Sequence, residues 1–71
     1  MYRALIADDE SFILDGLRAI VPWERYNVEI AYEALDGDDA SAILEDEKID
    51  LLISDIRMPG KNGIELLREI R

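Results

Sequence analysis

Apolar residues follow two kinds of spacing along the chain, and the two kinds alternate. Strand-like runs cover residues 3–7, 28–34 and 50–54. Helical spacing covers residues 12–21, a segment ending near Asp46, and a segment after Asn62. Continuous apolar runs of about 4–8 residues are typical of buried strands, and an i, i+3, i+4 spacing is typical of helices packed on a sheet. The strand–helix alternation predicts an α/β fold, in which a parallel sheet is built with right-handed crossovers.

The first predicted helix has clear limits in the sequence. Ser11 can cap its start, and Pro22 keeps Val21 out of helical angles, so the helix is expected to stop there. Its predicted buried face consists of Ile13, Leu14, Leu17, Ile20 and Val21. Trp23 is expected to cover the base of this helix.

The middle of the chain predicts a second strand and a second helix. Residues 28–34 alternate between apolar and polar side chains, which favours a strand near a sheet edge with one face better covered than the other. Asp36 and Gly37 are typical of a turn, after which Asp38 or Asp39 can begin a helix. The apolar stripe of that helix is Ala40, Ile43 and Leu44.

Composition excludes several classes of function. The 71 residues include no cysteine and no histidine, which excludes disulfides, thiolate zinc sites and triads that need an imidazole. The net charge of -9 disfavours direct binding to nucleic acid or to anionic membranes. No apolar run approaches the roughly 20 residues of a membrane span, and the start is too short for a secretory signal. A cytoplasmic location is therefore expected.

Acidic residues follow two of the predicted strands directly. Asp8 and Asp9 come after the first strand, and Asp55 comes after the third. Because the carboxyl ends of parallel strands meet at one edge of the sheet, we expect these three carboxylates to lie close together. Such a group repels itself unless a cation lies among its members. The pattern predicts a divalent-metal site that contains a reactive aspartate.

These residues also carry a family resemblance. The acidic pair, the sequence SDIRMPG over residues 54–60, and the dipeptide after Lys61 resemble the receiver domain of two-component response regulators. The resemblance spans residues 1–71 and implies a doubly wound, flavodoxin-like fold with strand order 2-1-3. These residues would be the first three of five βα units, an N-terminal portion of the domain cut within its third helix.

The resemblance assigns a role to each site residue. Asp55 matches the phosphoacceptor, which takes a phosphoryl group from a sensor histidine kinase. Asp9 matches the direct Mg²⁺ ligand, Asp8 the acidic residue that acts through a bound water, and Arg57 the residue whose backbone carbonyl is the third protein ligand. Mg²⁺ prefers oxygen ligands, and it catalyses phosphoryl transfer mainly by neutralising charge. Such a domain is a phosphoacceptor that takes part in its own phosphotransfer, rather than an enzyme with a separate substrate.

The resemblance also implies partners, and in one respect the chain departs from the pattern of the family. A Pro-Trp-Glu segment at residues 22–24 is similar to receivers joined to AraC-type DNA-binding domains, so a transcriptional output domain is expected in the parent chain. Receivers carry a hydroxyl residue and a lysine after later strands, both of which would lie beyond Arg71, and Lys61 does not match that lysine. Without those strands the third strand would have an exposed edge, so the segment is expected to dimerise through that edge, aggregate or remain partly unfolded.

Other interpretations fit parts of the pattern. Aspartates at strand ends are common as turn and helix-cap residues, and Glu10 fits a solvated helix start as well as a metal site. A haloacid-dehalogenase-type phosphohydrolase also uses an aspartate nucleophile after its first strand, but it needs a second aspartate where this chain has Glu10. A flavodoxin-like module needs a phosphate loop that the acidic pair would oppose. An inactive interaction fragment is the remaining alternative, and metal titration distinguishes it from a receiver.

Overall fold

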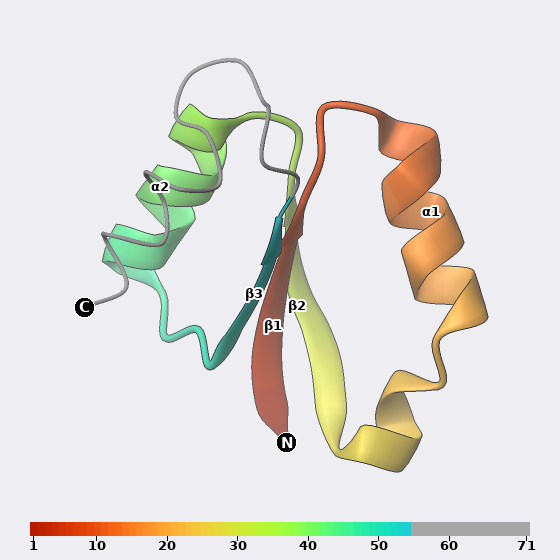
Figure 1. Cartoon of the computed structure of the whole chain (residues 1–71). Helices are drawn as coiled ribbons and strands as arrows, with labels where there is room; N and C mark the ends of the chain where they lie inside the picture. The colour runs from red at the N-terminus through yellow and green to blue at the C-terminus, as the bar shows by residue number, and fades with distance from the viewer. Residues whose placement is uncertain (55–71) are drawn as a thin grey trace.

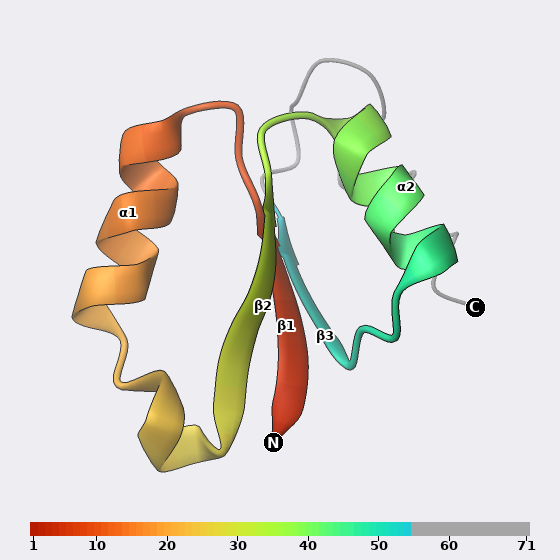
Figure 2. The same ribbon diagram turned by 180° about the vertical axis from the view of Figure 1, so that it is seen from behind.

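A three-stranded parallel sheet lies between two helices in the computed structural model, which describes residues 1–54. The elements are β1 (Tyr2–Ala7), α1 (Ser11–Ile20), the short 3-10 helix η1 (Trp23–Tyr26), β2 (Val28–Ala34), α2 (Gly37–Asp46) and β3 (Leu51–Ser54). The strand order is β2-β1-β3. Figures 1 and 2 show α1 on one face of the sheet and α2 on the other. The predicted fold class and strand order are confirmed, and the predicted third helix lies outside the described residues.

Both helices start differently from the prediction. The N-cap of α1 is Glu10, whose side chain makes no capping hydrogen bond, so the prediction of Ser11 as the cap was wrong. At α2 the cap is Asp36, whose carboxylate accepts a hydrogen bond from the Asp39 backbone N–H at 2.7 Å. A cap must lie just outside the helix, and α2 begins at Gly37, one residue before Asp38 and two before Asp39, the starts that the sequence indicated. The stop before Pro22 is confirmed, because Val21 has extended backbone angles.

The core is built around β1 and is deepest beneath α2. Residues 4–7 of β1 are all 3% exposed or less, as expected for the central strand of the described sheet. Under α2 the buried cluster consists of Leu5, Ala7, Ala34 and Ala40, with Tyr32, Ile43, Leu44, Ile49 and Leu52 packed against it. The predicted stripe of α2 therefore faces the sheet.

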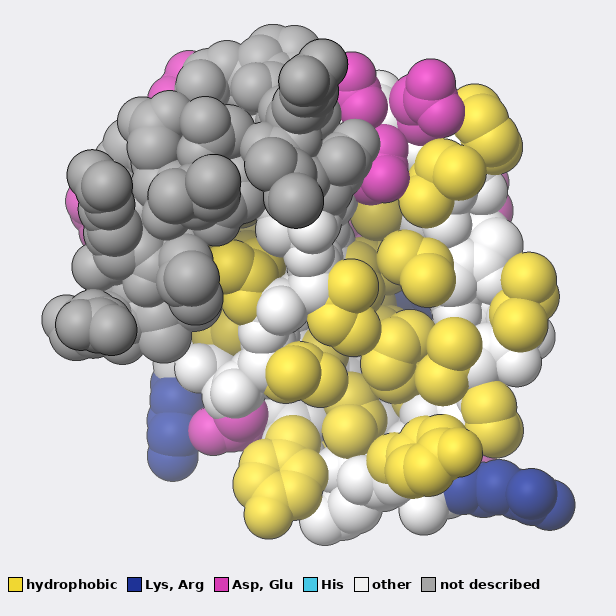
Figure 3. All heavy atoms as spheres, in the orientation of Figure 1, with side chains coloured by type: hydrophobic (Ala, Val, Ile, Leu, Met, Phe, Trp, Pro, Cys, Tyr) yellow, Lys and Arg dark blue, Asp and Glu magenta, His cyan; other side chains and the backbone are white. Residues whose placement is uncertain are grey.

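The predicted buried face of α1 is only partly confirmed. Within residues 1–54, Leu14 is the one buried residue of α1, whereas Ile13 is 36% exposed and Ile20 is 81% exposed. Apolar side chains gather between β3 and α1 in the space-filling view (Figure 3). Helical spacing identified which residues share a side of α1, but spacing alone does not show how much of that side the sheet covers.

A β-bulge in β2 divides its apolar side chains between the two faces of the sheet. Two consecutive residues of β1 pair with Ile30 and Tyr32, so Ala31 is the extra residue. Tyr32 and Ala34 therefore pack in the cluster under α2. Val28 and Ile30 instead line a hollow beside α1 and η1. The simple alternation predicted for 28–34 is interrupted at the bulge, and both faces receive apolar groups.

A cluster around Tyr32 ties α2 and the start of β3 to the sheet. The Tyr32 hydroxyl donates to Glu47 Oε1 at 2.7 Å and accepts from Arg3 Nη2 at 3.3 Å. The Arg3 guanidinium also lies 5.5 Å from the centroid of the Tyr32 ring. Asp50 donates its backbone N–H to the Arg3 carbonyl at 2.8 Å and accepts the Arg3 N–H on Oδ2 at 2.9 Å. These contacts hold the connection between α2 and β3 against β1 and β2.

We expect Tyr32 to make stability depend on alkaline pH. The hydrogen bond to Glu47 raises the pKa of Tyr32, because only the protonated phenol can donate it. A pKa raised in the folded state means that this stabilisation is present below the unfolded value of about 10 and is lost as pH rises through the folded value. Urea denaturation on either side of pH ~10 should show a shallower loss of stability in Tyr32→Phe than in wild type. Tyr26→Phe, at an exposed position, is the control, and equal slopes in all three proteins would contradict the expectation.

We expect Gly16→Ala to stabilise α1. Apart from its chain neighbours and the adjacent backbone of α1, a Cβ at Gly16 would meet no atom of residues 1–54 within 4 Å. Alanine loses less backbone entropy on helix formation, so the free energy of unfolding should rise by about 0.5–1 kcal/mol. Ala19→Gly, at an exposed position of the same helix, should lower it by a similar amount. Urea denaturation measures both changes, and a destabilised Gly16→Ala protein would show that the prediction is wrong.

Candidate phosphoacceptor and metal site

The turn after β1 holds the acidic pair at the carboxyl edge of the sheet. The Asp8 backbone N–H donates to the Ala34 carbonyl at 3.1 Å, which extends the pairing of β1 with β2 by one residue. Asp8 Oδ1 then accepts the Glu10 backbone N–H at 3.0 Å. This local hydrogen bond orients the Asp8 carboxylate and turns the chain into α1. Asp8 is partly exposed and Asp9 exposed, so both carboxylates are accessible to an ion from solvent.

The end of β3 lies beside the end of β1. The two strands are parallel, and their last paired residues are Ala7 and Ser54. Asp8 follows Ala7 in the sequence, and Asp55 follows Ser54. Asp55 and Arg57 themselves lie outside the described residues. The pairing confirms that the two predicted strand ends meet at one edge of the sheet.

A hollow of about 410 Å³ opens at this edge. Its lining includes the polar residues Asp8, Asp9, Glu10 and Ser54 and the apolar residues Ile13, Leu17 and Ile53. Acidic side chains gather beside the turn between β1 and α1, at the top of Figure 3. The site therefore combines carboxylate oxygens with an apolar wall that α1 and β3 supply.

The donor chemistry of this edge fits Mg²⁺, but residues 1–54 do not complete a metal site. Carboxylate oxygens are the ligands that Mg²⁺ prefers, and it usually keeps several waters. Within residues 1–54 no group of three or more acidic side chains is close enough to hold a metal. Asp8 and Asp9 are two of the predicted ligands, and the other two, Asp55 and Arg57, are outside the described part.

The sequence interpretation missed that β2 contributes acidic residues to the same edge. β2 is parallel to β1 and pairs with it up to Ala34. Asp36, Asp38 and Asp39 follow, with Asp36 engaged as the α2 cap. The sequence does contain this feature, because a third group of aspartates follows the predicted strand at residues 28–34. These residues make the edge more negative, which favours cations and disfavours anions that arrive without one.

The family of the chain follows from comparison with known proteins. A family model described as "Response regulator receiver domain" matches residues 4–71. The chain belongs to the response regulator receiver domain family. The motifs from which the sequence analysis inferred the resemblance lie within the matched residues.

Relatives among curated proteins are response regulators. The chain is 44% identical over 71 residues to an uncharacterized response regulatory protein of Staphylococcus epidermidis. It is 43% identical over 70 residues to the transcriptional regulatory protein HptR of Staphylococcus aureus. It spans 28% of the length of each. The description of HptR as a transcriptional regulatory protein thus refers to its whole chain, of which this chain matches only a part.

Solved structures similar to the chain are receivers or response regulators. The receiver domain of AraT, a response regulator from Geobacillus stearothermophilus, matches with a TM-score of 0.84 and 37% identity, over 94% of this chain and 52% of that one. A chain of the CheX–CheY–BeF3–Mg²⁺ complex from Borrelia burgdorferi matches with a TM-score of 0.80 and 31% identity, over 97% of this chain and 52% of that one. These matches agree with the 2-1-3 strand order.

Proposed function

We propose that this receiver accepts a phosphoryl group on Asp55 from a sensor histidine kinase and thereby controls an output domain. The observation that carries the proposal is the pairing of Ala7 with Ser54. That pairing brings together the two strand ends that Asp8 and Asp55 follow in the sequence. Membership of the receiver family adds the expectation that Asp55 is the acceptor. The Asp55 carboxylate would attack the phosphorus, and the histidine nitrogen would leave with the bonding electron pair.

Asp8, Asp9, Asp55 and the Arg57 carbonyl would hold Mg²⁺. A bound Mg²⁺ would supply positive charge to the carboxylates and to the incoming phosphoryl oxygens. The chain's own contribution is to orient the carboxylates. The hydrogen bond from the Glu10 N–H occupies Asp8 Oδ1, whereas Asp8 Oδ2 accepts no hydrogen bond from a group of residues 1–54. The family resemblance implies Asp9 as the direct ligand and Asp8 as the ligand that acts through water.

The output would be transcriptional, through a DNA-binding domain elsewhere in the parent chain. HptR, a transcriptional regulatory protein, supports this proposal, as does the acidic charge of the segment itself. A charge of -9 opposes direct contact with DNA, so DNA contact is assigned to the other domain. Within residues 1–54, neither helix has the length and apolar character needed to cross a membrane. We place the proposed function in the cytoplasm, where a kinase would supply the phosphoryl group.

Phosphorylation by a small phosphodonor tests the proposal. The intact protein would be incubated with acetyl phosphate, with Mg²⁺ or with excess chelator, and its mass measured. We expect the mass gain of one phosphoryl group in Mg²⁺ and little gain in chelator, because unshielded carboxylates repel the donor. A protein that gains no phosphoryl group under either condition, from acetyl phosphate or from phosphorylated kinase, would be the inactive interaction fragment that the sequence left as an alternative.

A further inference from the structure

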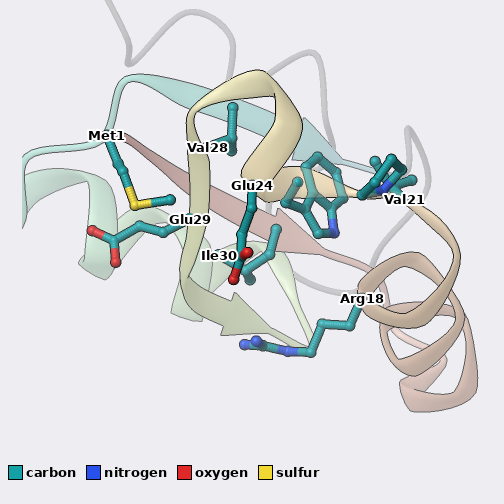
Figure 4. Close-up of a pocket in the computed structure, with 9 residues that line it drawn as sticks. Met1, Arg18, Val21, Glu24, Val28, Glu29 and Ile30 are labelled. Carbon is teal, nitrogen blue, oxygen red and sulfur yellow. The ribbon is translucent and has the colours of Figure 1, made fainter.

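A second hollow, of about 600 Å³, lies at the edge of the sheet where the strands begin. It opens between α1, η1 and β2 (Figure 4). Residues lining it include Arg18, Val21, Trp23, Glu24, Val28 and Ile30. Val28 is the first residue of β2, so this hollow is at the opposite end of the strands from the acidic pair. We propose that it is a docking site for an arginine or lysine side chain of a partner protein.

The floor of the hollow is apolar because of the bulge in β2. The extra residue at Ala31 turns Val28 and Ile30 away from the α2 cluster and toward η1. Val28 is only 7% exposed, so it forms a packed base rather than a loose surface. Arginine and lysine carry long apolar stems that cover such surfaces while the charged head stays near water. The apolar floor of the hollow can therefore pack against the apolar stem of an arginine or lysine side chain.

The walls of the hollow are held by hydrogen bonds. Trp23 donates its indole N–H to the Leu17 carbonyl at 3.1 Å, which fastens η1 to the end of α1. Asn27, in the left-handed region with φ of 58°, donates its N–H to the Glu24 carbonyl at 3.1 Å. Its own carbonyl accepts the Tyr2 N–H at 2.7 Å, which fastens η1 to β1. A preformed site of this kind avoids the entropy cost of ordering a loop on binding.

The charges of the hollow favour a cation. The Arg18 guanidinium forms an ion pair with Glu33, so its charge is already compensated. Met1, Glu24 and Glu29 also line the hollow, and none of them forms an ion pair within residues 1–54, so two carboxylates stand against one α-ammonium group. Figure 4 shows the Glu24 side chain directed toward Ile30. The Glu24 carboxylate therefore lies near the apolar floor. There it can form an ion pair with the charged end of an arginine or lysine side chain whose apolar stem contacts Val28 and Ile30. A second copy of this chain is disfavoured as the occupant, because each copy carries a net charge of -9.

A pair of dipeptides tests the proposal in the intact protein. Acetyl-Leu-Arg-amide is the probe, and acetyl-Leu-citrulline-amide is its uncharged match. The reporters are the Trp23 indole N–H signal, assigned with Trp23→Phe, and the methyl signals of Val28 and Ile30. We expect saturable shifts with the arginine peptide, at a dissociation constant on the order of 1 mM, and weaker binding of the citrulline peptide.

Two matched variants test whether binding of the arginine peptide depends on the charge of Glu24. Glu24→Gln should weaken binding of the arginine peptide about fivefold, which corresponds to roughly 1 kcal/mol. Glu45→Gln, which removes an exposed charge on α2, should leave the affinity unchanged. Both positions are exposed, and overlaid amide spectra check that each variant is folded. Equal binding of the two peptides, unchanged affinity in Glu24→Gln, or shifts that grow with protein concentration without peptide would each overturn the proposal.

Discussion

Asp55→Asn is expected to abolish phosphorylation of the intact protein by acetyl phosphate in Mg²⁺. Asparagine has nearly the shape of aspartate, but its amide oxygen is a far weaker nucleophile than a carboxylate and carries no charge for a metal. The signal in mass spectrometry should fall to the level of protein that received no phosphodonor. This is the largest effect we expect, because it removes the reacting atom itself rather than a group that supports it.

Asp46→Asn is the matched control for that experiment. Asp46 is an exposed aspartate at the last position of α2, and it follows no strand. The variant removes one negative charge, as Asp55→Asn does, so the net charge of the two proteins is the same. Asp46→Asn should be phosphorylated to the wild-type extent. Phosphorylation that persists at full level in Asp55→Asn would assign the acceptor to another residue and would contradict the proposed function.

Asp9→Asn is expected to weaken Mg²⁺ binding by at least about tenfold. Loss of groups that only orient a ligand typically weakens metal binding 10–100-fold, and Asp9 is proposed as a direct ligand. The backbone N–H signals of Asp8, Asp9 and Glu10 report the titration, because the Asp8–Glu10 hydrogen bond lies within the turn that would hold the ion. Trp23 is a poor reporter, because it lines the other hollow, at the opposite end of the strands from the acidic pair.

Two further variants make the Mg²⁺ titration specific. Asp8→Asn should weaken binding less than Asp9→Asn, because a ligand that acts through water contributes less than a direct one. Asp38→Asn changes an aspartate that follows the neighbouring strand, so it tests whether general negative charge at this edge is enough. Equal affinities in wild type and Asp9→Asn would show that the assignment of Asp9 is wrong. An equal loss in all three variants would mean that the ion is held by diffuse charge rather than by ligands.

The strand–helix order and the edge of the sheet that carries the acidic pair could be predicted from the sequence alone. β2 was predicted to the residue, and Pro22 marked where α1 must stop. These features depend on local rules, namely the period of apolar residues and the angles that proline excludes. The position of Asp8 and Asp9 after a buried parallel strand was enough to predict an acidic site at the carboxyl edge. Family membership of the chain confirmed the fold that these rules favoured.

Only the tertiary structure decided how the elements meet. The bulge at Ala31 moved Val28 and Ile30 to a different face from Tyr32, because one extra residue reverses the alternation of a strand. Likewise Ile20 shares the helical spacing of Leu14 but is 81% exposed, because burial depends on where the sheet lies and not on the spacing. The hydrogen bond that orients Asp8 and the one that fastens Trp23 depend on the path of the backbone between elements. Periodicity records which residues share a side, whereas contacts between distant segments exist only once the chain has packed.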